Sequence, residues 1–321
     1  MELSAIYQPV EADLAQVEAS LKSMSQVDFP YLSEMLNYSL QSSGKRIRPA
    51  LTLLSGQFYN YDLTNLLPMA TAAEVLHTAT LVHDDAIDNS PTRRGRSTVY
   101  KVWGEEKAIL LGDYLFAEAG ALTATTQNLR VIRLFADTLK TISSGELNQA
   151  FNAFNLEQSH EQYFQRVSQK TAALFRMSTE SGAVLSHAPE ASIQILVEYA
   201  QNLGIAFQIV DDILDFIGTE EELGKPVGSD LTQGTLTLPA IMLLEQYPEN
   251  NPVKRFFTTR ADQGDIKQAI ELVRNSSIIA ECYQVAEDYC ARACQNLILL
   301  PDNASRKSLF VLADFITSRK R

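Results

Sequence analysis

The chain has 321 residues, of which 45% are hydrophobic and 21% charged, and its formal net charge is -12. This length and balance are those of a globular protein with a sizeable core. The acidity argues against a nucleic-acid partner, which requires a basic face, and no apolar run approaches the roughly 18 residues of a transmembrane segment.

Apolar residues at helical spacing predict a chain that is helical almost throughout. Pro30 separates two helical stretches between residues 9 and 42, and Pro68 is expected to begin a long helix that reaches Asp84. The sequence shows no period-2 strand pattern, repeat or domain boundary, so we expect one domain over residues 1–321, with 247–265 as a loose loop. Further helices are predicted at 50–59, 104–126, 130–152, 160–186, 190–217, 238–245, 265–272, 279–297 and 304–318.

Two basic segments are candidates for binding anions. Gly44-Lys45-Arg46-Ile47-Arg48-Pro49 stands before the helix expected at 50–59, where free backbone N–H groups also favour an anion. Thr92-Arg93-Arg94-Gly95-Arg96 has three arginines in four residues, and arginine can bind phosphate with two parallel hydrogen bonds. Taken alone, the first segment fits a solvated basic turn at least as well.

Two Asp-Asp-x-x-Asp clusters, at Asp84–Asp88 and Asp211–Asp215, are the features around which the chain is organised. Residues four apart share a helix face, so each cluster places like charges together, and these repel unless a cation is present. Mg²⁺ takes one or two carboxylates and completes its shell with water and substrate phosphates. A single acidic cluster is usually a solvated face, but both of these adjoin apolar sequence, where stray carboxylates are costly. Facing each other, they would form a clamp for metal and diphosphate.

Together these motifs resemble the trans-isoprenyl diphosphate synthases, or polyprenyl synthetases, over residues 40 to 240. Each motif is weak alone, but the ordered set is highly specific. The motifs are Gly-Lys-Arg-x-Arg-Pro at Gly44, His-Asp-Asp-x-x-Asp at His83, Arg-Arg-Gly at Arg93, Gly-Glu-x-x-Gln at Gly145, Lys-Thr at Lys170, Phe-Gln-x-x-Asp-Asp-x-x-Asp at Phe207 and Gly-Lys-Pro-x-Gly-Ser-Asp-Leu at Gly224.

The resemblance implies an all-α, single-domain bundle of ten or more mostly antiparallel helices around a central cavity. It implies a homodimer whose substrates are isopentenyl diphosphate and an allylic diphosphate, with Mg²⁺ as cofactor and three ions bound alongside substrate. In such enzymes the allylic C–O bond ionises, and the carbocation attacks the double bond of isopentenyl diphosphate. The departing diphosphate is the charge that the site must stabilise.

The resemblance also assigns roles to individual residues. Asp84, Asp88 and Asp211 would bind metal, with Asp215 as a further candidate, and Asp85 and Asp212 would support them. Thr171 and Gln208 would offer oxygen dipoles to the allylic cation. The residues that would bind the diphosphate groups are Arg93, Lys170 and Lys225 for the allylic substrate, and Lys45, Arg48, His77 and Arg94 for isopentenyl diphosphate.

Several residues keep simpler explanations. His77 could be a satisfied core histidine, Lys170 a snorkelling lysine, and Glu146 and Gln149 polar positions of a helix. His83 has no role implied by the resemblance, and we expect it to be structural. Thr235 stands where many family members have a second lysine, which removes one possible diphosphate cation.

Product length depends on the helix before the first Asp cluster, along which the growing tail should run. Ala79 and Thr80 lie just over one turn before Asp84, where short-chain members carry bulky aromatics. Both are small here, so the channel should continue, and Leu76 or the 145–154 helix would form its floor. We therefore expect a product longer than about twenty carbons.

Other interpretations stay open. One is a shorter-chain farnesyl or geranylgeranyl synthase, and another is a terpene cyclase of related fold. A cyclase needs no second diphosphate site, so the Gly44–Pro49 segment and Arg94 weigh against it. A third is a subunit of a heteromeric synthase, whose non-catalytic partners commonly lose an Asp cluster, whereas both are intact here. The cysteines (Cys282, Cys290 and Cys294) and the start of the chain, which lacks the basic and apolar segments of a signal peptide, lead us to expect a cytoplasmic location.

Overall fold

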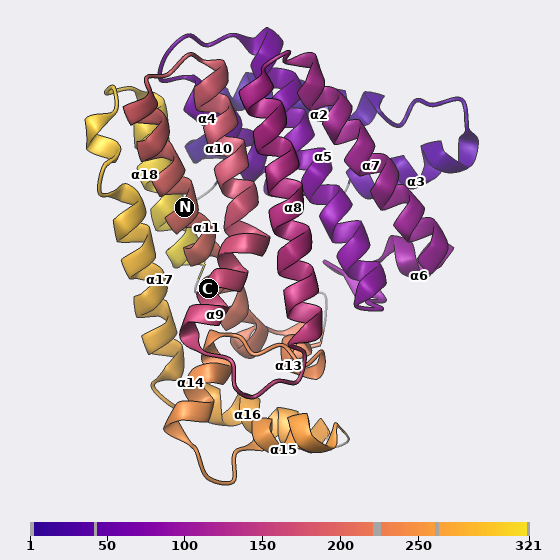
Figure 1. Ribbon diagram of the computed structural model, residues 1–321, viewed down its shortest axis with the longest axis vertical. Helices are drawn as coiled ribbons and strands as arrows, with labels where there is room; N and C mark the ends of the chain where they lie inside the picture. Colours follow the sequence, from indigo (N-terminus) through magenta and orange to yellow (C-terminus); the bar gives the residue numbers. More distant parts are fainter. Residues whose placement is uncertain (1–2, 42–43, 221–225, 261–262, 320–321) are drawn as a thin grey trace.

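The computed structural model describes residues 3–41, 44–220, 226–260 and 263–319, and these are helical almost throughout, which confirms the all-α prediction. Long helices run side by side, and the helices of residues 229–274 form a smaller layer across one end of them (Figure 1). The elements are α1 (Leu3–Tyr7), η1 (Gln8–Val10), α2 (Glu11–Ser23), α3 (Pro30–Leu40), α4 (Ile47–Gly56), α5 (Leu63–Ile87), β1 (Thr92–Arg93), β2 (Arg96–Ser97), α6 (Val99–Trp103), α7 (Glu105–Thr125), α8 (Leu129–Phe151), α9 (His160–Val167), η2 (Ser168–Ala172), α10 (Ala173–Leu185), α11 (Glu190–Ile217), α13 (Ser229–Thr232), α14 (Leu238–Gln246), α15 (Pro252–Thr259), α16 (Gln263–Arg274), α17 (Ile278–Cys294), η3 (Leu297–Leu299) and α18 (Ala304–Ser318).

Helix α5 is the central element of the bundle. Its middle turns are buried on every side, with Met69, Ala72, Leu76 and Ala79 all 0% exposed. A helix that is apolar all round belongs in the interior of a large domain. It packs along α7, while α10 packs on α4 and on α11, and α11 packs along α17. The last turn of α5 is therefore held at a fixed place among its neighbours.

The start of α5 differs from the prediction. The helix begins at Leu63 rather than at Pro68, because the Asp62 side chain accepts a hydrogen bond from Thr64 N at 3.0 Å and caps it. Pro68 therefore lies inside the helix, where its missing N–H costs one backbone hydrogen bond. The burial of Leu66 and Met69, both 0% exposed, offsets this cost.

Two further segments were wrongly predicted as irregular. Residues 92–97 form a two-stranded hairpin, in which Arg94 and Gly95 both have positive φ, as a type I′ turn requires. The hairpin is fixed to α3 by the Tyr38 hydroxyl, which donates to Ser97 O at 2.6 Å. Helix α15 occupies part of the expected loose loop, because Asn251 caps it and Pro252 suits its first turn.

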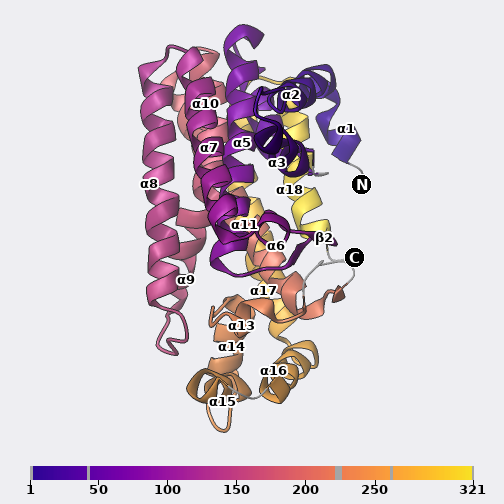
Figure 2. The same cartoon turned by 90° about the vertical axis from the view of Figure 1, so that its right-hand side faces the viewer.

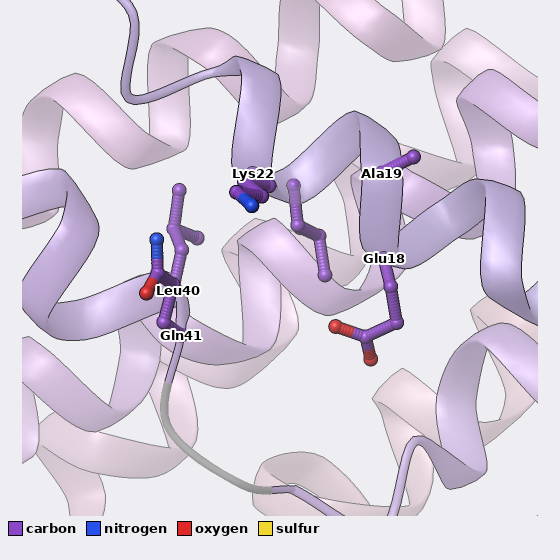
Figure 3. Close-up of a pocket in the computed structure, with 6 residues that line it drawn as sticks. Glu18, Ala19, Lys22, Leu40 and Gln41 are labelled. Atoms are coloured by element: carbon purple, nitrogen blue, oxygen red, sulfur yellow. The ribbon is translucent and has the colours of Figure 1, made fainter.

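A surface pocket of about 320 Å³ lies between α2 and the end of α3 (Figure 3), and it contains none of the predicted site residues. The residues that line the pocket are Glu18, Ala19, Leu21, Lys22, Leu40 and Gln41.

No helix within the described ranges is long and apolar enough to cross a membrane.

Two helical glycines offer a test of this packing. A Cβ at Gly182 in α10 would lie 2.1 Å from Thr52 O in α4, whereas a Cβ at Gly120 in α7 would meet nothing closer than 3.6 Å. We expect Gly182→Ala to destabilise the protein by about 1–3 kcal/mol, and Gly120→Ala to be neutral or stabilising by up to about 1 kcal/mol. Urea unfolding measures both, and equal midpoints for the two variants would contradict the close approach of α10 and α4.

Candidate active site

The last turn of α5 carries an acidic site whose charge is not balanced. Asp84 and Asp88 lie one turn apart at the end of this helix. Burial and the carboxylate of Glu146 raise the pKa of Asp84 to about 7, although Lys170 and Arg93 lower it. The pKa of Asp88 is raised by burial and by Glu146 and is also lowered by Lys170. A bound cation would stabilise the ionised form of this pair, and carboxylate oxygens suit a hard divalent ion.

Asp85 lies next to this pair but faces elsewhere. Its side chain is only 8% exposed and accepts a hydrogen bond from Arg93 Nε at 2.8 Å. The carboxylate therefore fixes the orientation of Arg93, a residue predicted to bind the allylic diphosphate. This supports the auxiliary role that the resemblance implied for Asp85.

A π-helical turn, η2, brings a cation towards the acidic site. The wider turn follows α9 and carries Lys170 and Thr171, and such turns are frequent at functional sites. Lys170 Nζ contacts Glu146 Oε1 at 2.6 Å and donates to Gln149 Oε1 at 3.0 Å. Gly145 makes this approach of α8 possible, because a Cβ there would lie 3.2 Å from Lys170 Cγ. Lys170 is thus part of an interhelical site rather than a snorkelling surface lysine.

The three carboxylates of the second cluster, on α11, face different partners. Asp211 pairs with Arg319 Nη2 at 2.7 Å, just past the end of α18. Asp212 is 3% exposed, and its two oxygens accept hydrogen bonds from Tyr163 and Gln208. Asp215 is 1% exposed and accepts hydrogen bonds from Ser229 Oγ at 3.0 Å and from the backbone N–H of Asp230 at 3.3 Å. This geometry favours Asp211 as the metal ligand and an anchoring role for Asp215.

Asp230 links the two clusters electrostatically. Its charge contributes to raising the pKa of Asp88 on α5 and that of Asp212 on α11, so the clusters border a common space. In the described part of the chain, no three acidic, histidine or cysteine side chains converge to hold a metal by themselves. A donor set of separate carboxylates fits Mg²⁺ that takes its remaining ligands from water and a diphosphate.

The predicted isopentenyl diphosphate residues form a second site of opposite charge. Partial desolvation lowers the pKa of Lys45, a residue exposed at the surface of the site, to about 8, with Arg319 and Arg94 lowering it further and Asp211 opposing them. Burial also lowers the pKa of Arg48 to about 10, and Arg94 again contributes. The pKa of His77 falls well below its usual value through burial and the charges of Arg48 and Arg94, so this imidazole is neutral.

A bound anion would stabilise this basic site. Cations whose pKa values fall through burial and mutual repulsion are stabilised when a negative charge binds among them. Within the described residues, the buried Arg48 Nε has no hydrogen-bond partner, and an unsatisfied buried donor is costly. A diphosphate would supply both the charge and the acceptor oxygens.

Comparisons with known proteins agree with this geometry. The polyprenyl synthetase family model matches residues 29–273. The chain belongs to the polyprenyl synthetase family. It is 36% identical over 320 residues to heptaprenyl diphosphate synthase component 2 of Bacillus subtilis, covering 100% of this chain and 92% of that one.

Solved structures resemble the synthetase over its whole length. A polyprenyl synthase from Caulobacter crescentus, complexed with calcium and isoprenyl diphosphate, superposes with a TM-score of 0.95 at 32% identity, covering 100% of this chain and 98% of that one. A decaprenyl diphosphate synthase from Rhodobacter capsulatus has a TM-score of 0.92 at 34% identity and full coverage of both chains. The synthetase is therefore a prenyltransferase with the all-α isoprenoid synthase fold.

An ion-pair network that the motifs did not reveal fixes the basic site of the synthetase. Arg46 has a left-handed backbone and pairs with Glu18 of α2 and, at 2.6 Å, with Glu74 of α5. The Glu74 side chain is 6% exposed, and its charge supports the protonation of Arg48 and Arg94. A buried carboxylate among three arginines limits their mutual repulsion in the absence of substrate.

Other predicted residues have clear positions in the synthetase. The His83 ring fits against Gly112, its Nε2 lies 2.9 Å from Ile109 O, and it stacks on Phe116 of α7, so its expected structural role is supported. Leu76 and Ala79 are fully buried and Thr80 is half-buried, so all three lie inside the bundle. Lys225 lies outside the described residues.

Four residues at or near the site were not predicted from the sequence: Glu74, Tyr163, Asp230 and Arg319. Asp230 could have been found, because it ends the Gly-Ser-Asp part of the last motif. The other three carry no local signal. Arg319 lies 108 positions from Asp211 in the sequence, and the packing of α18 on α11 brings them together. Figure 2 shows where α18 lies in the bundle.

The low pKa of Lys45 predicts a pH effect on one substrate. Its folded-state pKa is lowered to about 8, so in the free enzyme it loses its charge as the pH rises through that value. We expect kcat/KM for isopentenyl diphosphate to fall above pH 8 by up to about tenfold per pH unit, while Lys45→Arg removes this fall. Initial rates from pH 6.5 to 9.5, with each substrate varied separately, measure it; an identical fall for the allylic substrate would contradict the assignment.

Proposed function

We propose that the protein condenses an allylic diphosphate with isopentenyl diphosphate, head to tail and in trans geometry, to give a polyprenyl diphosphate longer than about twenty carbons. One observation carries this proposal. An acidic site, with Asp84 and Asp88, and a basic site, with Lys45, Arg48 and Arg94, lie next to each other, and each keeps charge that the protein offsets only in part. The charge of Asp211 reaches Lys45, Arg48 and Arg94, so the two sites are neighbours.

The acidic site would hold the allylic substrate. Asp84, Asp88 and Asp211 would bind Mg²⁺, three ions with substrate present, and bound Mg²⁺ would neutralise the leaving diphosphate. Arg93 and Lys170, with Lys225, would contact the diphosphate oxygens directly. Their charges would stabilise the diphosphate as the allylic C–O bond breaks. The calcium and isoprenyl diphosphate of the Caulobacter crescentus structure support this arrangement for a relative.

The basic site would hold isopentenyl diphosphate without metal. Lys45, Arg48 and Arg94 would bind its phosphates through charge-assisted hydrogen bonds, and neutral His77 would donate a further one. This leaves the double bond of isopentenyl diphosphate free to attack the allylic carbocation. The released diphosphate is the nearest base for the proton that then departs.

We propose that two polar side chains face the allylic cation. Thr171 Oγ1 and Gln208 Oε1 are hydrogen-bonded to each other at 2.6 Å, and both residues are partly buried between η2 and α11. Their oxygen dipoles would stabilise positive charge without reacting with it.

Several features support a product longer than about twenty carbons. Ala79 and Thr80 are small, and the solved relatives include a decaprenyl diphosphate synthase. We propose that the tail passes Ala79 and Thr80 and that Leu76 helps to form the floor. The alternative is a subunit of a heteromeric synthase, which the name of the Bacillus subtilis relative, component 2, favours.

We also propose a single catalytic domain over residues 1–321, a cytoplasmic location and a homodimer formed through α7 and α8. These helices expose large apolar side chains, including Leu110 at 60%, Leu147 at 61% and Phe151 at 87%. A second copy of the chain would bury them. Two of the cysteines are buried and the third is partly buried, which fits reduced thiols.

The assay of this function uses Mg²⁺, labelled isopentenyl diphosphate and allylic primers of several lengths, followed by chromatography of the dephosphorylated products. We expect the wild-type protein to extend a primer without a second protein. Asp84→Ala should lose at least about 100-fold in turnover, because a metal ligand is removed. Asp137→Ala, at an exposed site on α8, is the control. Near-normal turnover in folded Asp84→Ala would remove the metal assignment, and activity only with a second protein would favour the heteromer.

Product length is tested by filling the channel. We expect Ala79→Phe to shorten the product to about fifteen or twenty carbons while the first condensation continues, because the phenyl ring blocks the tail below the reacting carbon. The added volume costs about 1–3 kcal/mol in this packed helix. Leu76→Ala should lengthen or broaden the products. A wild-type product from folded Ala79→Phe would show that the tail does not pass Ala79.

A further inference from the structure

A continuous chain of hydrogen bonds runs from a buried tyrosine to the reaction centre. Tyr163 OH donates to Asp212 Oδ2 at 2.6 Å, and Gln208 Nε2 donates to Asp212 Oδ1 at 2.8 Å. Thr171 Oγ1 then donates to Gln208 Oε1 at 2.6 Å. The four residues come from α9, α11 and η2, so the chain also ties three elements together.

The order of donors and acceptors in this chain fixes the side-chain amide of Gln208. Both oxygens of Asp212 accept hydrogen bonds, one from the Tyr163 hydroxyl and one from the Gln208 amide, so the amide end that faces Asp212 is the NH₂ group. The carbonyl oxygen is then on the other side, where it meets Thr171. Reversing the amide would place two acceptor oxygens against each other and turn an NH₂ group towards the reaction centre.

Tyr163 is held rigidly at the far end of the chain. It is 0% exposed, stacks edge-on against Phe164 at 5.1 Å, and has the guanidinium of Arg166 5.6 Å from its ring. Arg166 is itself fixed by Gln158 Oε1 at 2.7 Å and by the carbonyl of Leu236. The hydroxyl therefore occupies one oxygen of Asp212 in a defined direction and leaves the other for Gln208.

We propose that Tyr163 is a positioning residue for the condensation. Through Asp212 it holds the Gln208 amide with its carbonyl oxygen, and the oxygen of Thr171, directed at the allylic cation. Without the tyrosine hydroxyl, Asp212 has a free oxygen and can rotate, and the Gln208 amide is no longer held in one orientation. The proposal rests on the proposed function, in which Thr171 and Gln208 face that cation.

A buried tyrosine could instead matter only for folding, and the chain offers a matched control. Tyr199 is also 0% exposed, and its hydroxyl donates to Leu309 O at 2.7 Å. That bond joins α11 to α18 and involves none of the proposed site residues. Tyr163→Phe and Tyr199→Phe thus each remove one buried hydroxyl with one hydrogen bond and keep the ring.

The experiment compares kcat, KM for each substrate and melting temperature in both variants. We expect similar losses of melting temperature. Tyr163→Phe should lower kcat about tenfold, because the Gln208 carbonyl dipole would stabilise the allylic cation less well in the transition state. Both KM values should stay within about twofold of wild type. Tyr199→Phe should keep wild-type kcat. Equal kcat values for the two variants, or a loss in KM instead of kcat, would overturn the proposal.

A double-mutant cycle identifies the route of the effect. In a Gln208→Leu background, Tyr163→Phe should lower kcat no further, because the residue it positions is absent. An additive loss would show that Tyr163 does not act through Gln208 and would overturn the proposal. A wild-type kcat for Gln208→Leu alone would show that Gln208 does not stabilise the cation, and it would overturn the role proposed for Tyr163 as well. The proposed function is tested separately, by the product assay.

A further measurement is made on the unaltered protein and does not depend on Tyr163→Phe folding. The side-chain NH₂ of Gln208, assigned by its loss in Gln208→Leu, should exchange with solvent slowly in ¹⁵N spectra, because it is bonded to a buried carboxylate. Rapid exchange would show that the amide is not held by Asp212 and would overturn the proposal.

Discussion

Uncompensated charge at the ends of two buried helices is the constraint on which the rest of this site depends. Asp84 and Asp88 end α5, at positions where burial and like charges raise the energy of an ionised carboxylate, and Asp211 lies on α11, where it pairs with Arg319. The protein supplies only partial compensation, through Lys170 for the first pair and Arg319 for Asp211. The negative charge that remains favours the binding of divalent cations. A diphosphate can then coordinate the same cations.

The basic site carries an excess of positive charge that is also only partly offset. Lys45, Arg48 and Arg94 repel one another, and the Glu74 carboxylate offsets only part of that repulsion. Two of its backbone positions, Arg46 and Arg94, adopt the left-handed conformation that non-glycine residues rarely take. Such strain is maintained where the surrounding contacts fix a functional geometry, and here these contacts are the Glu18 and Glu74 pairs and the hairpin turn.

Backbone devices bring the two sites together. The π turn of η2 presents Lys170 and Thr171 to α8 and α11, and Gly204 allows α11 to approach it, since a Cβ there would lie 2.6 Å from Ala172 Cα. Gly145 does the same for α8. These close approaches place the Lys170 ammonium, the Thr171 hydroxyl and the carboxylates around one space. Rigid helices therefore hold these side chains, while Lys45 lies just before α4 and Arg93 and Arg94 lie in the hairpin.

The sequence by itself determined the helical class, the long helix at 190–217, both acidic clusters and the basic segments. These follow from local periodicity and from short motifs, which are read within one helix or turn. The tertiary structure alone decided which carboxylate does what. Asp212 and Asp215 differ from Asp211 because Tyr163 and Ser229, distant in sequence, occupy their oxygens. It also brought Arg319 to Asp211 and Glu74 to Arg46, because only packing decides which faces of separate helices meet.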